Sequence, residues 1–184
     1  LRLFLPLIIS AFIWLFNLST FYAVDLTAFK AQSKIAPKAK LLAERHLQIW
    51  LDPELRKEEL SRMQKRNPEW DFMSRMYFIL ALTNISLLEP TYKSQALEII
   101  DLIIDDTLRI EKQKGHHHFL LGYANHGTWA IPPARSHFVD GEIAIMLGSR
   151  RFLEEHHEYR ERFVNRIRQM ERRMRQSPIF NAES

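Results

Sequence analysis

Residues 1–24 read LRLFLPLIISAFIWLFNLSTFYAV, and Arg2 is their only charged side chain. A helix rises about 1.5 Å per residue, so this stretch would extend about 36 Å, enough to cross a hydrocarbon core of about 30 Å. Helices of water-soluble proteins rarely run so far without a charged face. The stretch therefore predicts a transmembrane anchor over residues 1–24 of a single-pass membrane protein, with the lipid bilayer as its partner.

Two other interpretations of this stretch stay open. A cleaved signal peptide has an apolar region of about 7–15 residues and a small-x-small cleavage site. The apolar run here is longer, and Tyr22-Ala23-Val24 lacks that pattern. A buried core helix is expected to be shorter than this run. We therefore favour a retained span.

The basic residues that flank the span bear on its orientation. Arg2 precedes it, whereas five basic residues follow it: Lys30, Lys34, Lys38, Lys40 and Arg45. The positive-inside rule then slightly favours a cytoplasmic location for the rest of the chain. Because the sequence starts with Leu1 and not with Met, a few basic residues ahead of it would reverse this orientation. The side of the membrane is left open.

The composition favours an all-α protein with one ordinary-sized domain beyond the anchor. The chain has only five Gly, and runs rich in Leu, Ile, Glu and Arg replace the alternation that is typical of strands. The absence of Cys excludes disulfides, thiolate zinc sites and a cysteine nucleophile within these residues. Two helices are expected next, over residues 36–51 and 53–66, the second started by Asp52-Pro53. We assign residues 25–70 to a juxtamembrane helical linker.

Residues 71–184 show an alternation of two kinds of helix. Short and nearly all-apolar helices are predicted over 71–88 and 137–147. Each is followed by a long amphipathic helix, over 91–114 with Thr91 as cap and Gly115 at its end, and over 151–176. Such pairs are the units of α/α toroids, and two pairs cannot close one. The predicted fold is therefore a transmembrane helix followed by helical hairpins that resemble part of an α/α toroid, an incomplete domain over 71–184.

The helix predicted over 151–176 has the cleanest periodicity in the chain. Its stripe recurs at steps of three and four and consists of Phe152, Tyr159, Phe163, Ile167, Met170 and Met174, with His156 between the first two. A stripe of this kind packs along a neighbouring helix, so it predicts a docking surface for a protein of a membrane complex. The arginines of the same helix alternate with glutamates, which indicates a solvated face and no nucleic-acid partner.

The candidate chemistry lies in the loop over 115–136 and at the start of the helix that follows it. Five His and two carboxylates occur between His116 and Glu142, and such groups serve metal binding and proton transfer. Their spacing matches no metal-site template, so we assign neither a metal nor a cofactor. The candidate catalytic residues are Tyr123, His126, Asp140 and Glu142. The competing interpretation is structural, because Asp140 and Glu142 also interact favourably with the dipole of their helix.

The run Phe138-Val-Asp-Gly-Glu-Ile-Ala-Ile-Met-Leu-Gly-Ser-Arg-Arg151, with Ser177-Pro178 and Asn181-Ala-Glu-Ser184, resembles segments of bacterial α/α-barrel proteins. The nearest group is the linalool dehydratase/isomerase-like domain family, and the resemblance covers about residues 70–184. It implies a barrel around an apolar cavity in which polar residues, cysteines among them, add and remove water. This chain has no Cys, so no catalytic residue is carried over from that family.

Two hypotheses about function follow. The first is the membrane-anchored N-terminal part of an α/α-barrel protein that acts on an apolar or glycan substrate. The second is a non-catalytic accessory subunit of a membrane protein complex, which docks through the anchor and through the stripe between Phe152 and Met174. The first requires further helix pairs after Ser184, whereas the second does not.

Overall fold

The structure is a computed structural model that describes residues 4–22, 26–31, 34–125, 129 and 131–177. The described residues form α-helices and short 3₁₀ helices and contain no strand, which confirms the all-α fold class. The chain divides into two compact units, Leu1–Ala39 and Lys40–Ser184.

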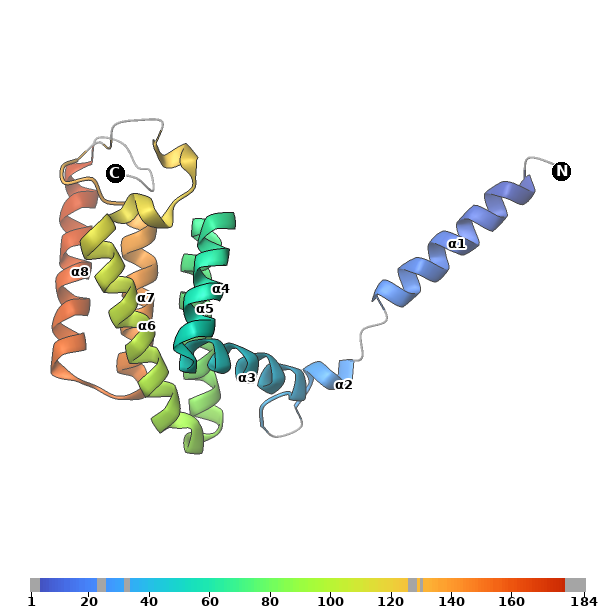
Figure 1. The fold of residues 1–184 in the computed structure, drawn as a ribbon, viewed down its shortest axis with the longest axis horizontal. Helices are drawn as coiled ribbons and strands as arrows, with labels where there is room; N and C mark the ends of the chain where they lie inside the picture. Colours follow the sequence, from blue (N-terminus) through green and yellow to red (C-terminus); the bar gives the residue numbers. More distant parts are fainter. Residues whose placement is uncertain (1–3, 23–25, 32–33, 126–128, 130, 178–184) are drawn as a thin grey trace. The chain divides into compact units, whose positions relative to one another are not determined.

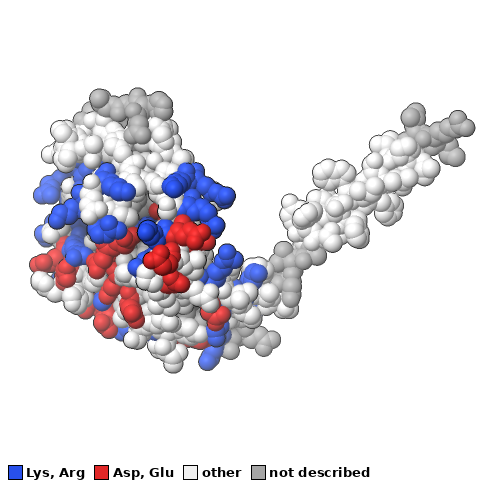
Figure 2. Space-filling model, viewed as in Figure 1, with Lys and Arg blue, Asp and Glu red and all other residues white. Residues whose placement is uncertain are grey.

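The first unit contains α1 (Phe4–Tyr22) and the short α2 (Leu26–Phe29). None of the side chains of α1 is buried, and its visible face in Figure 2 carries no Lys, Arg, Asp or Glu. Phe4–Phe29 contains an 18-residue window with a mean hydropathy of 1.9 and is the one segment in the described part of the chain that is long and apolar enough to cross a membrane. The anchor prediction is therefore supported by length and composition, and the side of the membrane stays a prediction.

The second unit is a bundle in which α5 to α8 lie side by side (Figure 1). The boundary between the two units falls within α3 (Pro37–Leu51), most of which belongs to the second unit. The other α-helices of this unit are α4 (Pro53–Arg66), α5 (Pro68–Leu88), α6 (Lys93–Lys114), α7 (His137–Leu153) and α8 (His157–Gln176). Its 3₁₀ helices are η1 (Pro90–Tyr92), η2 (His116–Phe119) and η3 (Gly122–Asn125). α5 packs against α4, α6 and α7, and α7 also packs against α6 and α8. The second unit thus takes in α4, which the sequence assigned to the linker.

Two capped starts position α4 and α5. Asp52 Oδ1 accepts from the backbone N–H groups of Glu54 and Leu55 at 2.9 and 3.1 Å, and α4 has the predicted bounds. Asn67 Oδ1 accepts from the N–H of Trp70 at 3.0 Å. Because a proline fits the first helical position, Pro68 starts α5 directly after α4, and the predicted start at residue 71 was too late.

The core lies where α5, α6 and α7 meet. Phe72 and Ile79 of α5, Ile100 and Ile103 of α6 and Leu147 of α7 have no exposed surface. Burying a side chain of this size contributes about 1.5–3 kcal/mol relative to leaving it in water. α5 packs against α4, α6 and α7, and ten of its side chains are buried, whereas Trp70, Tyr77, Leu87 and Leu88 are exposed.

The boundary between the last two helices was predicted wrongly. α7 continues past residue 147 to Leu153, and α8 begins only at His157. Glu154 has an extended backbone, and its carbonyl accepts from Arg150 Nη1 at 2.6 Å across the turn. Neither Pro nor Gly stands in this turn, so the sequence carries no local stop signal there. Phe152 consequently belongs to α7 and not to the last helix.

The start of α6 was predicted wrongly and its end correctly. The predicted start at Thr91 was wrong, because Pro90–Tyr92 forms the 3₁₀ helix η1 and α6 begins at Lys93. The predicted end was correct: Gly115 follows the last turn with φ +73° and ψ −178°. This backbone conformation is open to glycine almost alone. It turns the chain from α6 into η2, which carries His116.

For Gly115→Ala we expect the free energy of unfolding to fall by about 1–3 kcal/mol, because the new side chain must adopt this positive φ. Urea unfolding of the full chain in mild detergent, followed by circular dichroism, measures the change. Gly122→Ala is the matched control, since an added Cβ meets no atom within 4 Å at either position and Gly122 has no positive φ. An equal loss in both variants would contradict the explanation.

Candidate functional site

The segment between α6 and α7 is held against α8 by one buried arginine. The guanidinium of Arg173 donates to the carbonyl oxygens of Ile131, Pro133 and Arg135 at 3.1, 3.0 and 3.4 Å. Ser136 then caps the N-terminus of α7. These contacts hold the side chain of Arg135 beside the first turn of α7 and the last turn of α6.

Five side chains from four segments meet at this place and form what we call the buried ion cluster: Glu111, His116, Arg135, Asp140 and Arg166. Arg135 donates to Glu111 Oε1 at 2.8 Å and, through Nε, to Asp140 Oδ2 at 3.1 Å. Arg166 of α8 donates to Glu111 Oε2 at 2.7 Å and also to Asp140. The side chain of Asp140 is only 1% exposed. Each carboxylate is therefore shared by two guanidinium groups.

His116 is held in one tautomer. The backbone N–H of Ser136 donates to His116 Nδ1 at 2.8 Å, so Nδ1 carries no proton. Nε2 lies 2.8 Å from Glu111 Oε1 and donates to it. Both nitrogens of the imidazole are therefore engaged. In this arrangement the ring offers no free lone pair to a metal.

The donor set of the cluster resembles a metal site but is already paired. Ligand atoms of Glu111, His116 and Asp140 lie within 4.8 Å of one another, and imidazole with carboxylates suits zinc or iron. However, Arg135 and Arg166 donate to the same carboxylate oxygens. A divalent cation would have to displace two guanidinium groups, because like charges so close together repel. The geometry therefore favours an ion-pair network.

The electrostatics of the cluster agree with that assignment. Burial raises the pKa of Glu111, but the hydrogen bonds from His116 and Arg166 and the charge of Arg166 outweigh it, so the pKa lies far below its usual value. Burial lowers the pKa of Arg135, whereas its bonds and proximity to Asp140 and Glu111 raise it, with a net increase. Glu111 thus stays ionised opposite the guanidinium groups of Arg135 and Arg166.

Three of the four predicted catalytic residues lie in the described part of the chain, and their surroundings differ. Asp140 is in the buried ion cluster, and Tyr123 is in η3 with 58% of its surface exposed. His126 lies outside the described residues. Glu142 is half-buried on α7; its Oε2 has no hydrogen-bond partner, and burial raises its pKa. Among the three described members, Asp140 forms ion pairs with Arg135 and Arg166.

Sequence reasoning did not assign Glu111, Arg135 or Arg166 to the site of Asp140. Glu111 stands in the last turn of α6, and Arg135 directly precedes the capping serine of α7. The sequence indicates both positions only weakly, because each lies next to a helix cap. Arg166 has no such signal, because it is one of many arginines on α8 and its partner Glu111 is 55 residues away in the chain.

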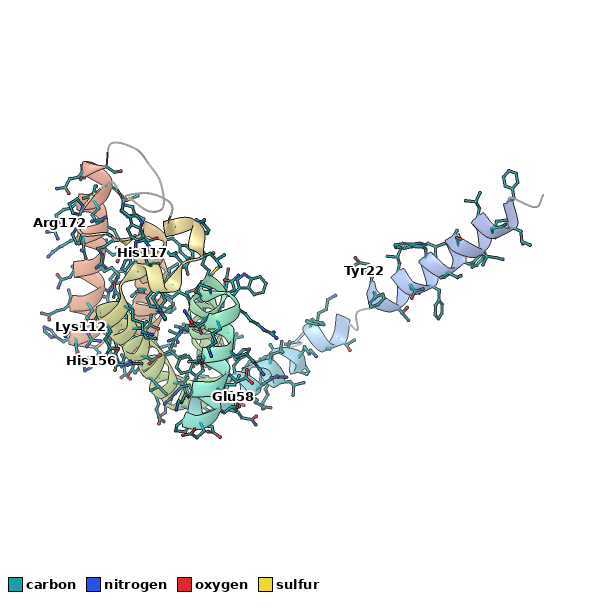
Figure 3. All side chains as sticks on the ribbon, turned by 45° about the horizontal axis from the view of Figure 1, so that its top comes forward. Tyr22, Glu58, Lys112, His117, His156 and Arg172 are labelled. Carbon is teal, nitrogen blue, oxygen red and sulfur yellow. The ribbon has the colours of Figure 1, made fainter. Side chains whose placement is uncertain are left out.

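Figure 3 shows the next histidine, His117, at the end of the bundle, where its ring centre lies 4.2 Å from that of Trp129.

A second feature is an apolar groove of about 620 Å³ formed by α5, α7 and α8. None of its lining side chains is charged. The larger ones are Leu80 and Leu87 of α5, Ile145 and Phe152 of α7, and Phe163, Ile167 and Met170 of α8. A second depression of about 420 Å³ shares Ile167 and Met170 and continues along α8 to Met174, with the charged Glu171 and Arg175 also in its lining. We call the two together the apolar groove.

Five of the six residues predicted for a partner surface line this groove, and one does not. Phe152 is 72% exposed, and Ile167 and Met174 are also exposed. Tyr159 instead is buried, with the guanidinium of Arg150 4.6 Å from its ring centre. Tyr159 therefore packs inside the unit and adds nothing to an exposed surface. The stripe splits because Phe152 belongs to α7, whereas Phe163, Ile167, Met170 and Met174 belong to α8.

Comparison of the chain with protein-family models, curated proteins and solved structures finds no match. The resemblance to the linalool dehydratase/isomerase-like family stays a prediction. Conclusions about function therefore depend on the geometry of the buried ion cluster, the groove and the remaining cavities.

In Arg166→Met we expect the free energy of unfolding to fall by about 3–5 kcal/mol, because Glu111 and Asp140 would stay buried with one guanidinium between them. Urea unfolding of the full chain in mild detergent measures it. Arg168→Met is the control, since Arg168 is exposed on the same helix. A similar small effect in both variants would show that the cluster does not hold α8.

The depressed pKa of Glu111 predicts a pH dependence. Its contribution to stability is fully present above about pH 4.5, where the unfolded glutamate ionises, and is lost as the pH falls toward the folded pKa. We therefore expect Glu111→Gln to be less stable than the native chain at pH 7, with a difference that shrinks below pH 4.5. Unfolding series between about pH 3 and 7 test this. Glu98→Gln, at an exposed position of α6, should show no such trend.

Proposed function

We propose that this chain is a membrane-anchored helical domain that docks a helix of another membrane protein in the apolar groove. The observation that carries the proposal is the groove itself, an elongated surface of exposed apolar side chains on three helices without a charge in its main part. Contiguous apolar patches of this kind mark interaction sites on soluble domains. Charged side chains gather instead over α4, α6 and α8 on the face seen in Figure 2.

The shape of the groove favours a helix as its occupant. From Phe163 to Met174 its α8 wall extends about 17 Å, or three helical turns. The groove is also lined by three small residues of α7, which leave room for an occupant: Gly141, Ala144 and Gly148. An amphipathic helix buries its apolar face in such a groove through residues at i, i+3, i+4 and i+7. A small apolar molecule would fill one of the two depressions and leave the other exposed.

The anchor supports the choice of a membrane protein as partner. α1 would hold the chain in the bilayer, where a partner shares the same two-dimensional surface. Tethering of this kind raises the effective concentration of the two surfaces without any added contact. A modest groove then suffices for a stable complex.

A second candidate function is the α/α-barrel enzyme acting on an apolar or glycan substrate. The observation in its favour is the order of the bundle: α5 and α7 pack against each other, and each is followed in the chain by a helix that packs on it, α6 or α8. In that case a further helical hairpin of the same polypeptide would cover the groove. Glu142, half-buried with a raised pKa, would be its best general acid.

Photocrosslinking at Ile145 in native membranes tests the proposal. Ile145 is an exposed residue of the groove, so we expect a photoreactive phenylalanine there to give an adduct with one different, membrane-embedded polypeptide. The same probe at Lys112, which projects from α6 in Figure 3, is the control and should not give this adduct.

Three outcomes would contradict docking of a partner helix. A link within the same polypeptide would favour the barrel enzyme, and an adduct with a second copy would make the groove a homodimer interface. The absence of an adduct at Ile145 would overturn both candidate functions of the groove. As a second variant, Leu87→Glu should abolish the adduct, whereas Leu87→Met should keep it, since only the first places a charge in the groove.

A further inference from the structure

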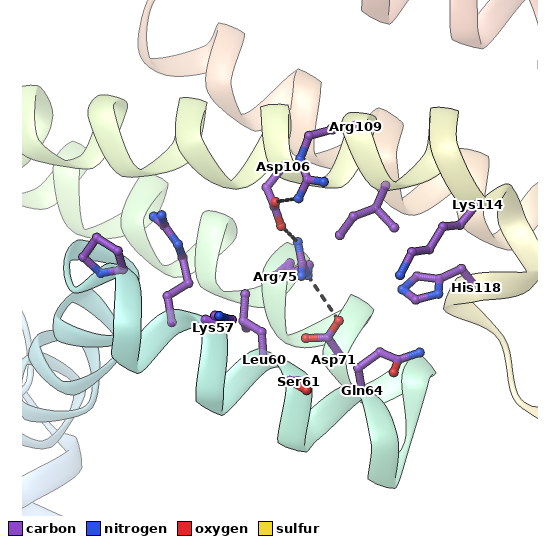
Figure 4. Close-up of a pocket in the computed structure, with 13 residues that line it drawn as sticks. Lys57, Leu60, Ser61, Gln64, Asp71, Arg75, Asp106, Arg109, Lys114 and His118 are labelled. Carbon is purple, nitrogen blue, oxygen red and sulfur yellow. Dashed lines mark hydrogen bonds and ion pairs between the residues drawn. The ribbon is translucent and has the colours of Figure 1, made fainter.

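A polar cavity of about 470 Å³ lies between α4, α5 and α6, and His118 of η2 completes its lining. We call it the α4–α6 pocket (Figure 4). It shares no residue with the apolar groove or the buried ion cluster. Its volume is in the range of sites that hold small organic ligands.

The pocket has an excess of positive charge. Five of its lining side chains are cationic and two are carboxylates: Arg56, Lys57, Arg75, Arg109 and Lys114, against Asp71 and Asp106. The two carboxylates already serve two of the arginines. Asp106 accepts from Arg75 at 2.7 Å and also from Arg109, and Asp71 Oδ2 lies 3.4 Å from Arg75 Nε.

Three cations of the pocket consequently have no carboxylate partner. Arg56 uses one nitrogen on the carbonyl of Trp50 at 2.9 Å. Lys57 of α4 and Lys114 of α6 make no hydrogen bond or ion pair with any described residue. Five cations around one cavity attract an anion, and guanidinium with ammonium donors is the combination that holds phosphate groups.

A buried acceptor at the pocket wall points to a ligand with a hydrogen-bond donor. The side chains of Asp71 and Arg75 are both 3% exposed. Yet Asp71 Oδ1 accepts no hydrogen bond, and Arg75 Nε has only its ion pair with Asp71 Oδ2. A buried polar atom left without a partner costs about 1–3 kcal/mol. Burial also raises the pKa of Asp71, although the charge of Arg75 lowers it in part. A ligand hydroxyl that donates to Asp71 would relieve this cost.

We propose that the α4–α6 pocket binds a phosphorylated polyol, with Lys57, Arg56 and Lys114 attracting the phosphate and Asp71 accepting from a hydroxyl group. The neutral side chains of Ser61 and Gln64 on α4 supply further hydrogen-bonding groups for the hydroxyls. His118 adds an acceptor, since burial and the charges of Lys114 and Arg75 lower its pKa and keep the imidazole neutral. This proposal is independent of what occupies the apolar groove.

The test is a titration of the full chain in maltoside micelles with inositol 4-phosphate, followed by calorimetry. We expect binding that Lys57→Ala and Lys114→Ala each weaken about tenfold, the effect of one charge-assisted contact. Lys65→Ala is the matched control, because Lys65 is exposed on the same helix as Lys57 but does not line the pocket. No binding, or an equal loss in Lys65→Ala, would overturn the proposal.

Two further arms identify the chemistry and the source of the ligand. Phenyl phosphate, which lacks hydroxyl groups, should bind at least fivefold more weakly than inositol 4-phosphate. Equal affinities would refute the role of Asp71. Phosphatidylinositol 4-phosphate mixed into the micelle should compete with the soluble compound if the ligand is a lipid headgroup. If it does not compete while the soluble compound binds, the ligand is a free organic phosphate.

Discussion

Two carboxylates buried between helices, each shared by two guanidinium groups, constrain the arrangement of the second unit. Glu111 comes from α6, Asp140 from α7, Arg135 from the segment between them and Arg166 from α8. Buried ion pairs of this kind contribute little net stability, but the loss of any one partner leaves an unpaired charge in a low dielectric and costs several kcal/mol. A shift of α8 would therefore expose two carboxylates to that cost. The cluster is better described as a determinant of register than as a reaction centre.

The cluster also decides which surfaces of the unit stay available. With α8 held at its C-terminal half by Arg166 and Arg173, its Phe163 and Ile167 lie along the outer edge of α7. The remaining apolar side chains of α7 then face outward beside α5. The buried ion cluster can therefore have a structural role, while the apolar groove and the α4–α6 pocket can serve as two separate binding surfaces. None of the three shares its defining side chains with another.

Local signals in the sequence predicted much of the fold. The caps at Asp52 and Gly115 and the apolar anchor depend on neighbours within one or two helical turns, and the structure agrees with them. The turn between α7 and α8 has no such neighbours, and its prediction failed. It forms because α8 packs back on α7 and Arg150 reaches the carbonyl of Glu154, which no pattern of residue types announces.

The candidate site, like the fold, was predicted from the sequence only in part. The sequence by itself determined that Asp140 stands in the first turn of a helix, that this region is rich in histidine, and that residues 1–24 are apolar enough to span a membrane. Only the tertiary structure decided that Asp140 is paired with two arginines, and that Lys57 and Lys114 share a pocket. The physical reason is that helix capping and hydropathy act between residues close in the chain. Charge pairing and cavities arise between residues far apart in the chain, such as Glu111 and Arg166 at 55 positions, which packing alone brings together.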